Sequence, residues 1–150
     1  GVNFKHYNFD HIQKLIMSDK KISKKLKKIV PNNIELLELD VQNLTFAENT
    51  FDYIIHSLVF CSVKDVSKGL KELKRVLKPN GTIIFIEHIL PERRGLKGLF
   101  SFINPAWRVF ASGCNLTRDY ESSLLANGFD VIHSTKFMKT AFVYGEAKIK

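Results

Sequence analysis

Acidic side chains end several of the apolar segments that predict β-strands in this sequence. Asp19 and Asp40 each follow such a segment, and Glu87 and His88 together end another. In an open parallel α/β sheet, ligands bind beyond the carboxyl ends of the strands. A carboxylate about one β-α unit into the sheet can accept both hydroxyls of a ribose, which suits Asp19. Local alternatives stay open, with Asp19 as the cap of the next helix and Asp40 as a turn residue. Glu87 either holds a loop or orients a substrate.

The two cysteines, Cys61 and Cys114, lack the close spacing typical of metal ligands or of a redox pair. We therefore expect reduced thiols, no metal site and a cytoplasmic protein, since disulfides are rare in that compartment. No matched histidine and acid accompany Cys61, so a small buried packing residue is the simpler interpretation of it.

The central elements that position these residues form one β-α-β unit. Apolar residues predict strands over 53–55 and 82–86, both suited to burial on two faces of a parallel sheet. Between them, apolar positions from Val66 to Leu77 recur on one helical face. Residues 78–81 (Lys-Pro-Asn-Gly) should end the helix in a turn.

Strands over 12–17 and 34–39 are expected before this unit, on either side of a helix over 20–30. Six lysines cover that helix and contribute to the net charge of +8. Such a surface can meet RNA or anionic lipid, but a solvated helix face is the simpler interpretation. Nucleic acid is not expected as a partner, because a nucleic-acid motif and interleaved aromatic residues are missing.

The segment after the central unit differs in character. Residues 96–113 are rich in large apolar side chains but contain Pro105, and we interpret them as a substrate cover or as packing over the sheet edge. Their aromatic content suits an apolar acceptor or a membrane surface. Thr117 is a plausible cap for a following helix. The strands expected over 129–137 and 142–149 are separated by few residues, which predicts an antiparallel hairpin.

Length and composition limit the class of protein. The chain has 150 residues, 45% of them hydrophobic, which fits one globular domain and excludes a disordered chain. It contains no uninterrupted apolar span of transmembrane length.

Taken in order, the motifs resemble those of class I S-adenosylmethionine-dependent methyltransferases of the ubiquinone/menaquinone-biosynthesis type (methyltransferase type 11). The motifs are Asp19, Asp40-Val41, 51–55 (Phe-Asp-Tyr-Ile-Ile) and 73–81 (Leu-Lys-Arg-Val-Leu-Lys-Pro-Asn-Gly). A narrower similarity, to the small methyltransferase-like alkyl-thiol methyltransferases, rests on 58–64, 87–88, 105–107 and 113–118.

This resemblance implies a Rossmann-like α/β sheet with helices on both faces and an antiparallel C-terminal hairpin. It also implies that the first central strand and most of the glycine-rich loop belong before Gly1, between the strands that begin near Ile12 and Phe51. We therefore expect residues 1–150 to be a single methyltransferase domain that is incomplete at its N-terminus.

The resemblance also implies roles for individual residues. S-adenosylmethionine would be bound by Gly1, Asn3, Asp19, Asp40, Val41, Ser57 and Leu58. Asp19 would bind its ribose, and Asp40 its adenine amino group. A substrate pocket would include His88, Trp107 and Asn115. His88 is the best-placed base for a thiol acceptor, although a structural role explains it as well, and no catalytic residue is assigned.

The expected function is methyl transfer to a small, apolar or lipid-like acceptor, with a thiol as the first specific candidate and peripheral membrane contact as an option. One alternative is an inactive binding module of the same fold that contacts nucleic acid or an anionic membrane. A second is a nucleotide-dependent dehydrogenase, against which the antiparallel terminal hairpin argues.

Overall fold

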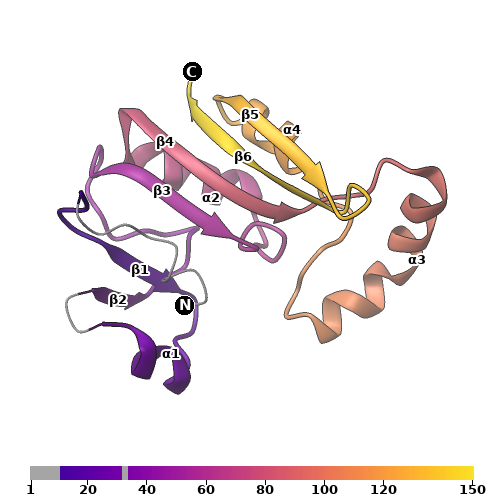
Figure 1. Ribbon diagram of the computed structural model, residues 1–150, viewed down its shortest axis with the longest axis horizontal. Coiled ribbons are helices and arrows are strands. Elements are labelled where there is room, and N and C mark those ends of the chain that lie inside the picture. Colours follow the sequence, from indigo (N-terminus) through magenta and orange to yellow (C-terminus); the bar gives the residue numbers. More distant parts are fainter. Residues whose placement is uncertain (1–10, 32–33) are drawn as a thin grey trace.

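The computed structural model describes residues 11–31 and 34–150 of the protein. Its strands form two sheets, one of two strands and one of four (Figure 1). The smaller sheet pairs β1 (Ile16–Asp19) in parallel with β2 (Glu35–Glu38). The larger has the order β3 (Phe51–Ser57), β4 (Leu77–His88), β6 (Phe142–Ile149) and β5 (Phe129–Phe137).

The larger sheet is mixed, as expected. The strands β3 and β4 run parallel, joined by the crossover helix α2 (Val66–Val76), whereas β6 is antiparallel to both β4 and β5. The β5–β6 turn passes through three residues with left-handed backbone angles, Met138, Lys139 and Thr140. The C-terminal hairpin is therefore confirmed at the predicted residues.

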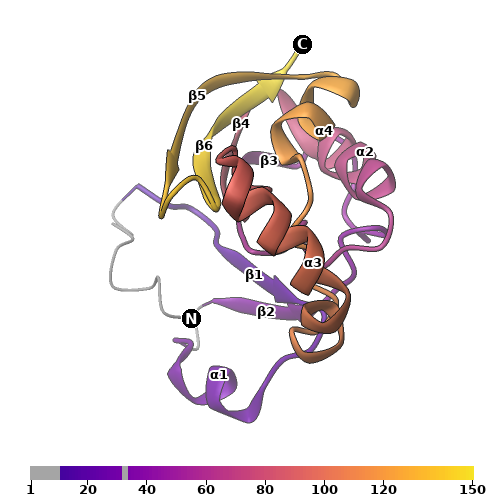
Figure 2. The ribbon, with the colours of Figure 1, turned by 90° about the vertical axis from the view of Figure 1, so that its right-hand side faces the viewer.

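Helices α2 and α4 (Tyr120–Ala126) pack on one face of the larger sheet (Figure 2). The buried core lies there and includes Phe60, Leu70, Leu73, Ile83, Phe85, Leu124 and Val143. Helices were expected on both faces. In the described ranges the opposite face presents the exposed side chains of Tyr53, Ile55 and Tyr144.

Two further helices lie outside this core. Helix α1 (Lys24–Ile29) follows β1, and α3 (Arg94–Phe110) follows β4 and contains Pro105. Helix α4 corrects one expectation, because its cap is Asp119, whose carboxylate accepts from the N–H of Ser122. Thr117 lies before this cap, and its hydroxyl donates to the side-chain oxygen of Asn115.

The strand β4 begins earlier than predicted. Leu77 already pairs with Phe51, and pairing resumes at Thr82 with Tyr53 after a shift in register. The intervening residues 78–81, expected as a turn, form this irregularity within the strand. A bulge accommodates a proline because the ladder is interrupted there.

The two sheets approach one another at β1 and β3 (Figure 1). No ladder joins these two strands within residues 11–31 and 34–150. This is the position at which the resemblance places a strand preceding Gly1.

Candidate functional site

The carboxyl ends of β1, β3 and β4 point toward the same side of the molecule, where α3 also lies (Figure 1). Asp19 ends β1, Ser57 ends β3 and His88 ends β4. The fold thus brings predicted site residues from distant parts of the sequence to one edge, the edge at which parallel α/β sheets bind ligands. Gly1 and Asn3 lie outside the described residues.

Asp19 does not cap the helix that follows it. The cap of α1 is Ser23, whose hydroxyl accepts from the N–H of Leu26 at 3.1 Å. Among residues 11–31 and 34–150, the Asp19 carboxylate accepts a single long hydrogen bond, 3.3 Å, from the N–H of Lys21, and Asp19 is exposed. The local explanation left open by the sequence is therefore wrong.

Asp40 is organised by its neighbour Gln42. It accepts from the backbone N–H of Gln42 at 2.9 Å and from the side-chain amide at 2.9 and 3.1 Å. These hydrogen bonds lower the pKa of Asp40 and keep it ionised. Gln42 in turn accepts from the N–H of Asp65, which links this turn to the start of α2. Val41, beside it, packs against the core.

The chain leaves β3 in a strained conformation. Leu58 has a φ of +54°, a region that bulky side chains rarely adopt, and its side chain is exposed. Its backbone N–H donates to the carbonyl of Ile86 at 2.8 Å, which fixes the conformation against β4. Such strain persists where surrounding structure holds it, commonly at ligand sites. Ser57, just before it, is also exposed.

Glu87 has a role that the sequence left open. It is fully buried, and its carboxylate accepts from three successive backbone N–H groups, those of Val59, Phe60 and Cys61, at 2.9, 2.9 and 3.0 Å. His56 also contacts it at 3.0 Å through Nδ1, while Nε2 of His56 meets the Tyr120 hydroxyl at 2.8 Å. Glu87 therefore fixes the loop after β3 onto the end of β4.

The electrostatics of this network follow from burial and hydrogen bonding. Burial alone would raise the pKa of Glu87, but the hydrogen bonds from His56, Phe60 and Cys61 outweigh it and lower the pKa. Burial, and then the nearby charge of Glu87, raise the pKa of Tyr120. Glu87 is thus an ionised structural anchor rather than a group that faces a ligand.

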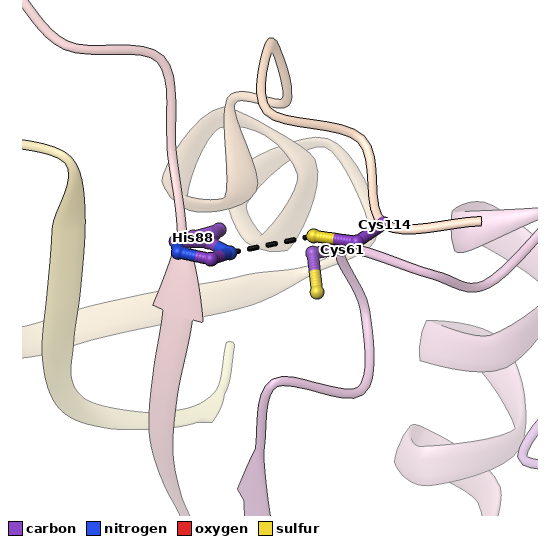
Figure 3. A group of neighbouring side chains, drawn as sticks. All are labelled: Cys61, His88 and Cys114. Carbon is purple, nitrogen blue, oxygen red and sulfur yellow. Dashed lines mark hydrogen bonds between the residues drawn. The ribbon is translucent and has the colours of Figure 1, made fainter. Parts of the chain in front are cut away.

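Next to this anchor, three potential metal-binding side chains converge (Figure 3). They are Cys61 in the loop after β3, His88 at the end of β4 and Cys114 after α3. The Nδ1 atom of His88 lies 3.3 Å from Sγ of Cys114, and the ligand atoms of all three lie within 4.8 Å of one another. Neither cysteine forms a disulfide.

The protonation of this cluster is set mainly by burial. Burial, followed by the Glu87 charge, raises the pKa of the Cys61 thiol to about 12. Burial also lowers the pKa of His88 against the opposing effect of Glu87, which favours a neutral imidazole at neutral pH. His88 is therefore available as an acceptor or ligand.

The remaining predicted substrate residues have different surroundings. Trp107 lies on α3 and is partly exposed. The side-chain oxygen of Asn115 accepts from Asn104 and from both the N–H and hydroxyl of Thr117. Its backbone N–H donates to the carbonyl of Cys61 at 2.8 Å, so Asn115 joins the two cysteine-bearing segments.

A partly buried arginine, Arg118, lies beside the cluster. Arg118 donates to the carbonyl of Val63, and in the part of the chain that the structure describes its Nη1 atom is buried without a hydrogen-bond partner. Desolvation lowers the pKa of Arg118, while the charges of Cys61, Glu87 and Cys114 act against that effect. This Nη1 donor is therefore not used by the described part of the protein.

Comparison with known proteins decides the family. The family described as methyltransferase domain matches residues 4–85, more than half of the chain. The chain belongs to this methyltransferase domain family. A human thiol S-methyltransferase (TMT1A) is 38% identical over 74 residues, which cover 49% of this chain and 30% of the human protein. A demethylmenaquinone methyltransferase of Staphylococcus haemolyticus is 38% identical over 85 residues, 53% of this chain and 36% of the bacterial protein.

Solved structures show the same fold. An S-adenosylmethionine dependent methyltransferase from Mesorhizobium loti aligns with a TM-score of 0.67 and 16% identity, over 90% of this chain and 80% of the other. The Rossmann-like methyltransferase fold is therefore confirmed. The methyltransferase-domain chain covers only about a third of the length of the curated relatives above.

The cluster of Cys61, His88 and Cys114 was not predicted as a unit. Close spacing of ligands is the signal that sequence offers for a metal site, and these residues lie far apart in the chain. The one usable signal was topological, because His88 ends a strand and Cys61 lies just beyond another.

No helix in the described ranges has the length and apolar character needed to cross a membrane.

Proposed function

We propose that this protein transfers a methyl group from S-adenosylmethionine to a small acceptor. The observation that supports this most directly is that Asp19, Asp40 and the Ser57–Leu58 turn all lie at or just beyond the carboxyl ends of strands β1, β2 and β3, which point toward the same side of the molecule. Asp19 has an exposed carboxylate suited to two ribose hydroxyls. Asp40 is ionised and held beside the apolar Val41, an arrangement suited to the adenine amino group and ring.

The reaction needs orientation more than covalent help from the protein. The sulfonium methyl group is attacked in line by a nucleophile, so a fixed site that excludes water supplies most of the acceleration. The strained Leu58 turn is anchored to β4 and would hold the methionine end of the donor in place.

A thiol is the acceptor that we propose first. Two features support it, namely the similarity to a thiol S-methyltransferase and the neutral, half-buried imidazole of His88 at the same edge. A thiol reacts as the thiolate, so a neighbouring group must take up its proton or stabilise the anion. A lipid-like quinol remains the second candidate, supported by the similarity to a demethylmenaquinone methyltransferase.

Titration calorimetry of the full-length protein with S-adenosylmethionine tests the proposed cofactor. We expect saturable binding, and correctly folded protein that binds none would contradict the enzyme proposal. A methyl-transfer screen across alkyl thiols, quinols and amines then tests the acceptor. Transfer to quinols or amines with none to thiols would overturn the thiol assignment while leaving methyl transfer intact.

Peripheral contact with an anionic membrane surface forms the last part of this proposal. Helix α3 exposes Leu99, Phe102, Val109 and Phe110, and Arg93, Arg94 and Lys97 lie at its start. An apolar face flanked by basic residues is the pattern of a helix that lies in a membrane interface. Such a contact would bring a lipid-like acceptor close to the carboxyl ends of the strands.

A further inference from the structure

The three side chains of Cys61, His88 and Cys114 offer two sulfur atoms and one imidazole nitrogen. This donor set is typical of zinc, which accepts thiolate and imidazole ligands in a tetrahedral arrangement. With bond lengths of about 2.3 Å to sulfur and about 2.0 Å to nitrogen, a tetrahedral ion separates its ligand atoms by about 3.5–3.8 Å. The atoms here lie within 4.8 Å of one another, and one pair is already at 3.3 Å.

The backbone around the cluster is fixed before any ion binds. The N–H of Cys61 donates to Glu87 at 3.0 Å, and the carbonyl of Cys61 accepts from Asn115 at 2.8 Å. The N–H of Cys114 donates to the carbonyl of Ala111 at 2.9 Å, and His88 follows Glu87 directly in β4. Partners of this kind orient metal ligands and are part of a preorganised site.

The enclosure of the cluster also suits an ion. Both cysteines are buried, at 2% and 7% exposure, and Leu116, Phe100 and Ile103 pack around them. The ring of Phe142 lies against His88 with 4.0 Å between ring centroids. An apolar shell of this kind excludes water and strengthens the bonds between a metal and its charged ligands.

We propose that Cys61, His88 and Cys114 bind one zinc ion and leave a fourth coordination position for the thiolate of the methyl acceptor. Three protein ligands with one open position are typical of catalytic zinc, whereas structural sites are closed by four. The role of the fourth position rests on the proposed methyl transfer to a thiol. The zinc site itself does not.

The charged groups near the cluster suit an acceptor thiolate as a third sulfur ligand of zinc. Zinc with two thiolates and a neutral imidazole carries no net charge, and an acceptor thiolate makes the assembly negative. Arg118 supplies a compensating positive charge, and its Nη1 atom is a buried donor without a partner in the described residues. The carboxylate of Glu87 is already engaged by His56 and three backbone N–H groups.

The chemical step balances without further reactants. The acceptor thiol releases its proton to solvent as its sulfur binds zinc. A lone pair of that sulfur then forms a bond to the sulfonium methyl carbon, and the bond from that carbon to the sulfonium sulfur breaks. The products are a neutral thioether and S-adenosylhomocysteine. The thioether is a weaker ligand than the thiolate, so it leaves the metal.

Metal analysis of the full-length protein, purified under a phosphine reductant, tests the site without any assay of activity. We expect about one zinc per chain, reduced at least tenfold in Cys61→Ser, Cys114→Ser and His88→Gln. His133→Asn removes an exposed histidine from β5 and should retain the metal. Circular dichroism identifies any variant that fails to fold, and His88→Gln keeps the test decisive if a cysteine variant does.

Cobalt substitution tests the fourth position. Tetrahedral cobalt with thiolate ligands absorbs strongly, and its spectrum should change on addition of ethanethiol if a coordination position is open. Metal-free protein with two reactive thiols, or an equal metal content in all variants, would contradict the proposed zinc site. Bound cobalt whose spectrum ignores the thiol would overturn the open position. Failure of S-adenosylmethionine to bind would alter neither readout, which separates this inference from the proposed function.

Discussion

At the scale of single residues, buried and exposed carboxylates have opposite roles in this protein. Glu87 is enclosed and satisfied by the chain, whereas Asp19 ends a strand in solvent with little holding it. A carboxylate that the fold does not use is the one available to a ligand. The two residues therefore predict different experimental outcomes.

Replacement of Asp19 should affect binding and leave folding nearly unchanged. We expect Asp19→Ala to weaken S-adenosylmethionine binding by about 1.5–3 kcal/mol, because hydrogen bonds from the ribose to a charged acceptor are lost. Titration calorimetry measures the change. Asp52→Ala is the matched control, because Asp52 lies at the amino end of β3, away from the carboxyl ends of the strands, and forms an ion pair with Lys78. Equal affinity in both variants would show that Asp19 has no part in the cofactor site.

Replacement of Glu87 should affect folding first. Glu87→Gln puts an amide donor where three N–H groups and His56 need acceptors, so at least one buried donor loses its partner. We expect a loss of about 1.5–3 kcal/mol in the free energy of unfolding, measured by urea denaturation. Glu146→Gln, on an exposed position of β6, should change it by less than about 0.5 kcal/mol. A Glu87 variant as stable as the control would contradict the anchoring role.

The sequence predicted which residues end strands but not what their side chains contact. Asp19 and His88 were placed at the sheet edge because strand ends follow from apolar patterns, whereas Ser57 was placed there through the family resemblance. The sequence could not decide whether Glu87 holds a loop or orients a substrate, because its partners come from the loop after β3, and only the register of β3 against β4 brings them near. The convergence of Cys114 on His88 depends in the same way on the path of α3.

At the scale of elements, local chemistry predicted the terminal hairpin well and the start of β4 poorly. The β5–β6 pair has clear apolar alternation and few residues between its strands, so its limits follow from the sequence alone. The early start of β4 depends on a partner, because Leu77 pairs with Phe51 before the irregularity at 78–81. Pairing with a distant strand overrides a local turn signal there.

Two glycines in different elements should respond to alanine in opposite ways. A Cβ atom on Gly145 of β6 would lie 2.2 Å from the carbonyl oxygen of His133 and 2.9 Å from the Cα of Ser134. Both are backbone atoms of β5, so the hairpin must open, and we expect Gly145→Ala to lower the unfolding free energy by about 1–3 kcal/mol or more.

Gly98 in α3 is the control for Gly145, because it lies in open surroundings. A Cβ atom there would meet nothing within 4 Å, and alanine favours a helix over glycine. Gly98→Ala should therefore raise the unfolding free energy by about 0.5–1 kcal/mol. Thermal or urea denaturation measures both variants, and a Gly145→Ala variant as stable as the parent protein would contradict the close packing of β5 against β6.

At the scale of the whole molecule, the proposed contact with an anionic membrane rests on two features, the net charge of +8 and the exposed apolar face of α3. Phe102 and Phe110 are 84% and 87% exposed, so their replacement costs the fold little. We expect Phe102→Ser with Phe110→Ser to weaken sedimentation with phosphatidylglycerol vesicles, and added salt to weaken it for every variant by screening.

Ile29→Ser is the control for that experiment. Ile29 is an exposed apolar residue at the end of α1, on the opposite side of the molecule from α3 (Figure 1), and its replacement should leave vesicle binding unchanged. Equal binding by the α3 double variant and this control would remove the helix from the proposed membrane contact.

The separation of Cys61, His88 and Cys114 along the chain has a consequence for the order of assembly. Cys61 becomes enclosed only when β3 and β4 have joined, and Cys114 only when the segment after α3 has folded back beside His88. The accessibility of each thiol therefore reports when its segment folds. A thiol-reactive dye added at successive times during refolding should stop labelling each cysteine once its segment has packed. Variants with a single cysteine would show whether β3 and β4 pair before the segment after α3 packs beside His88.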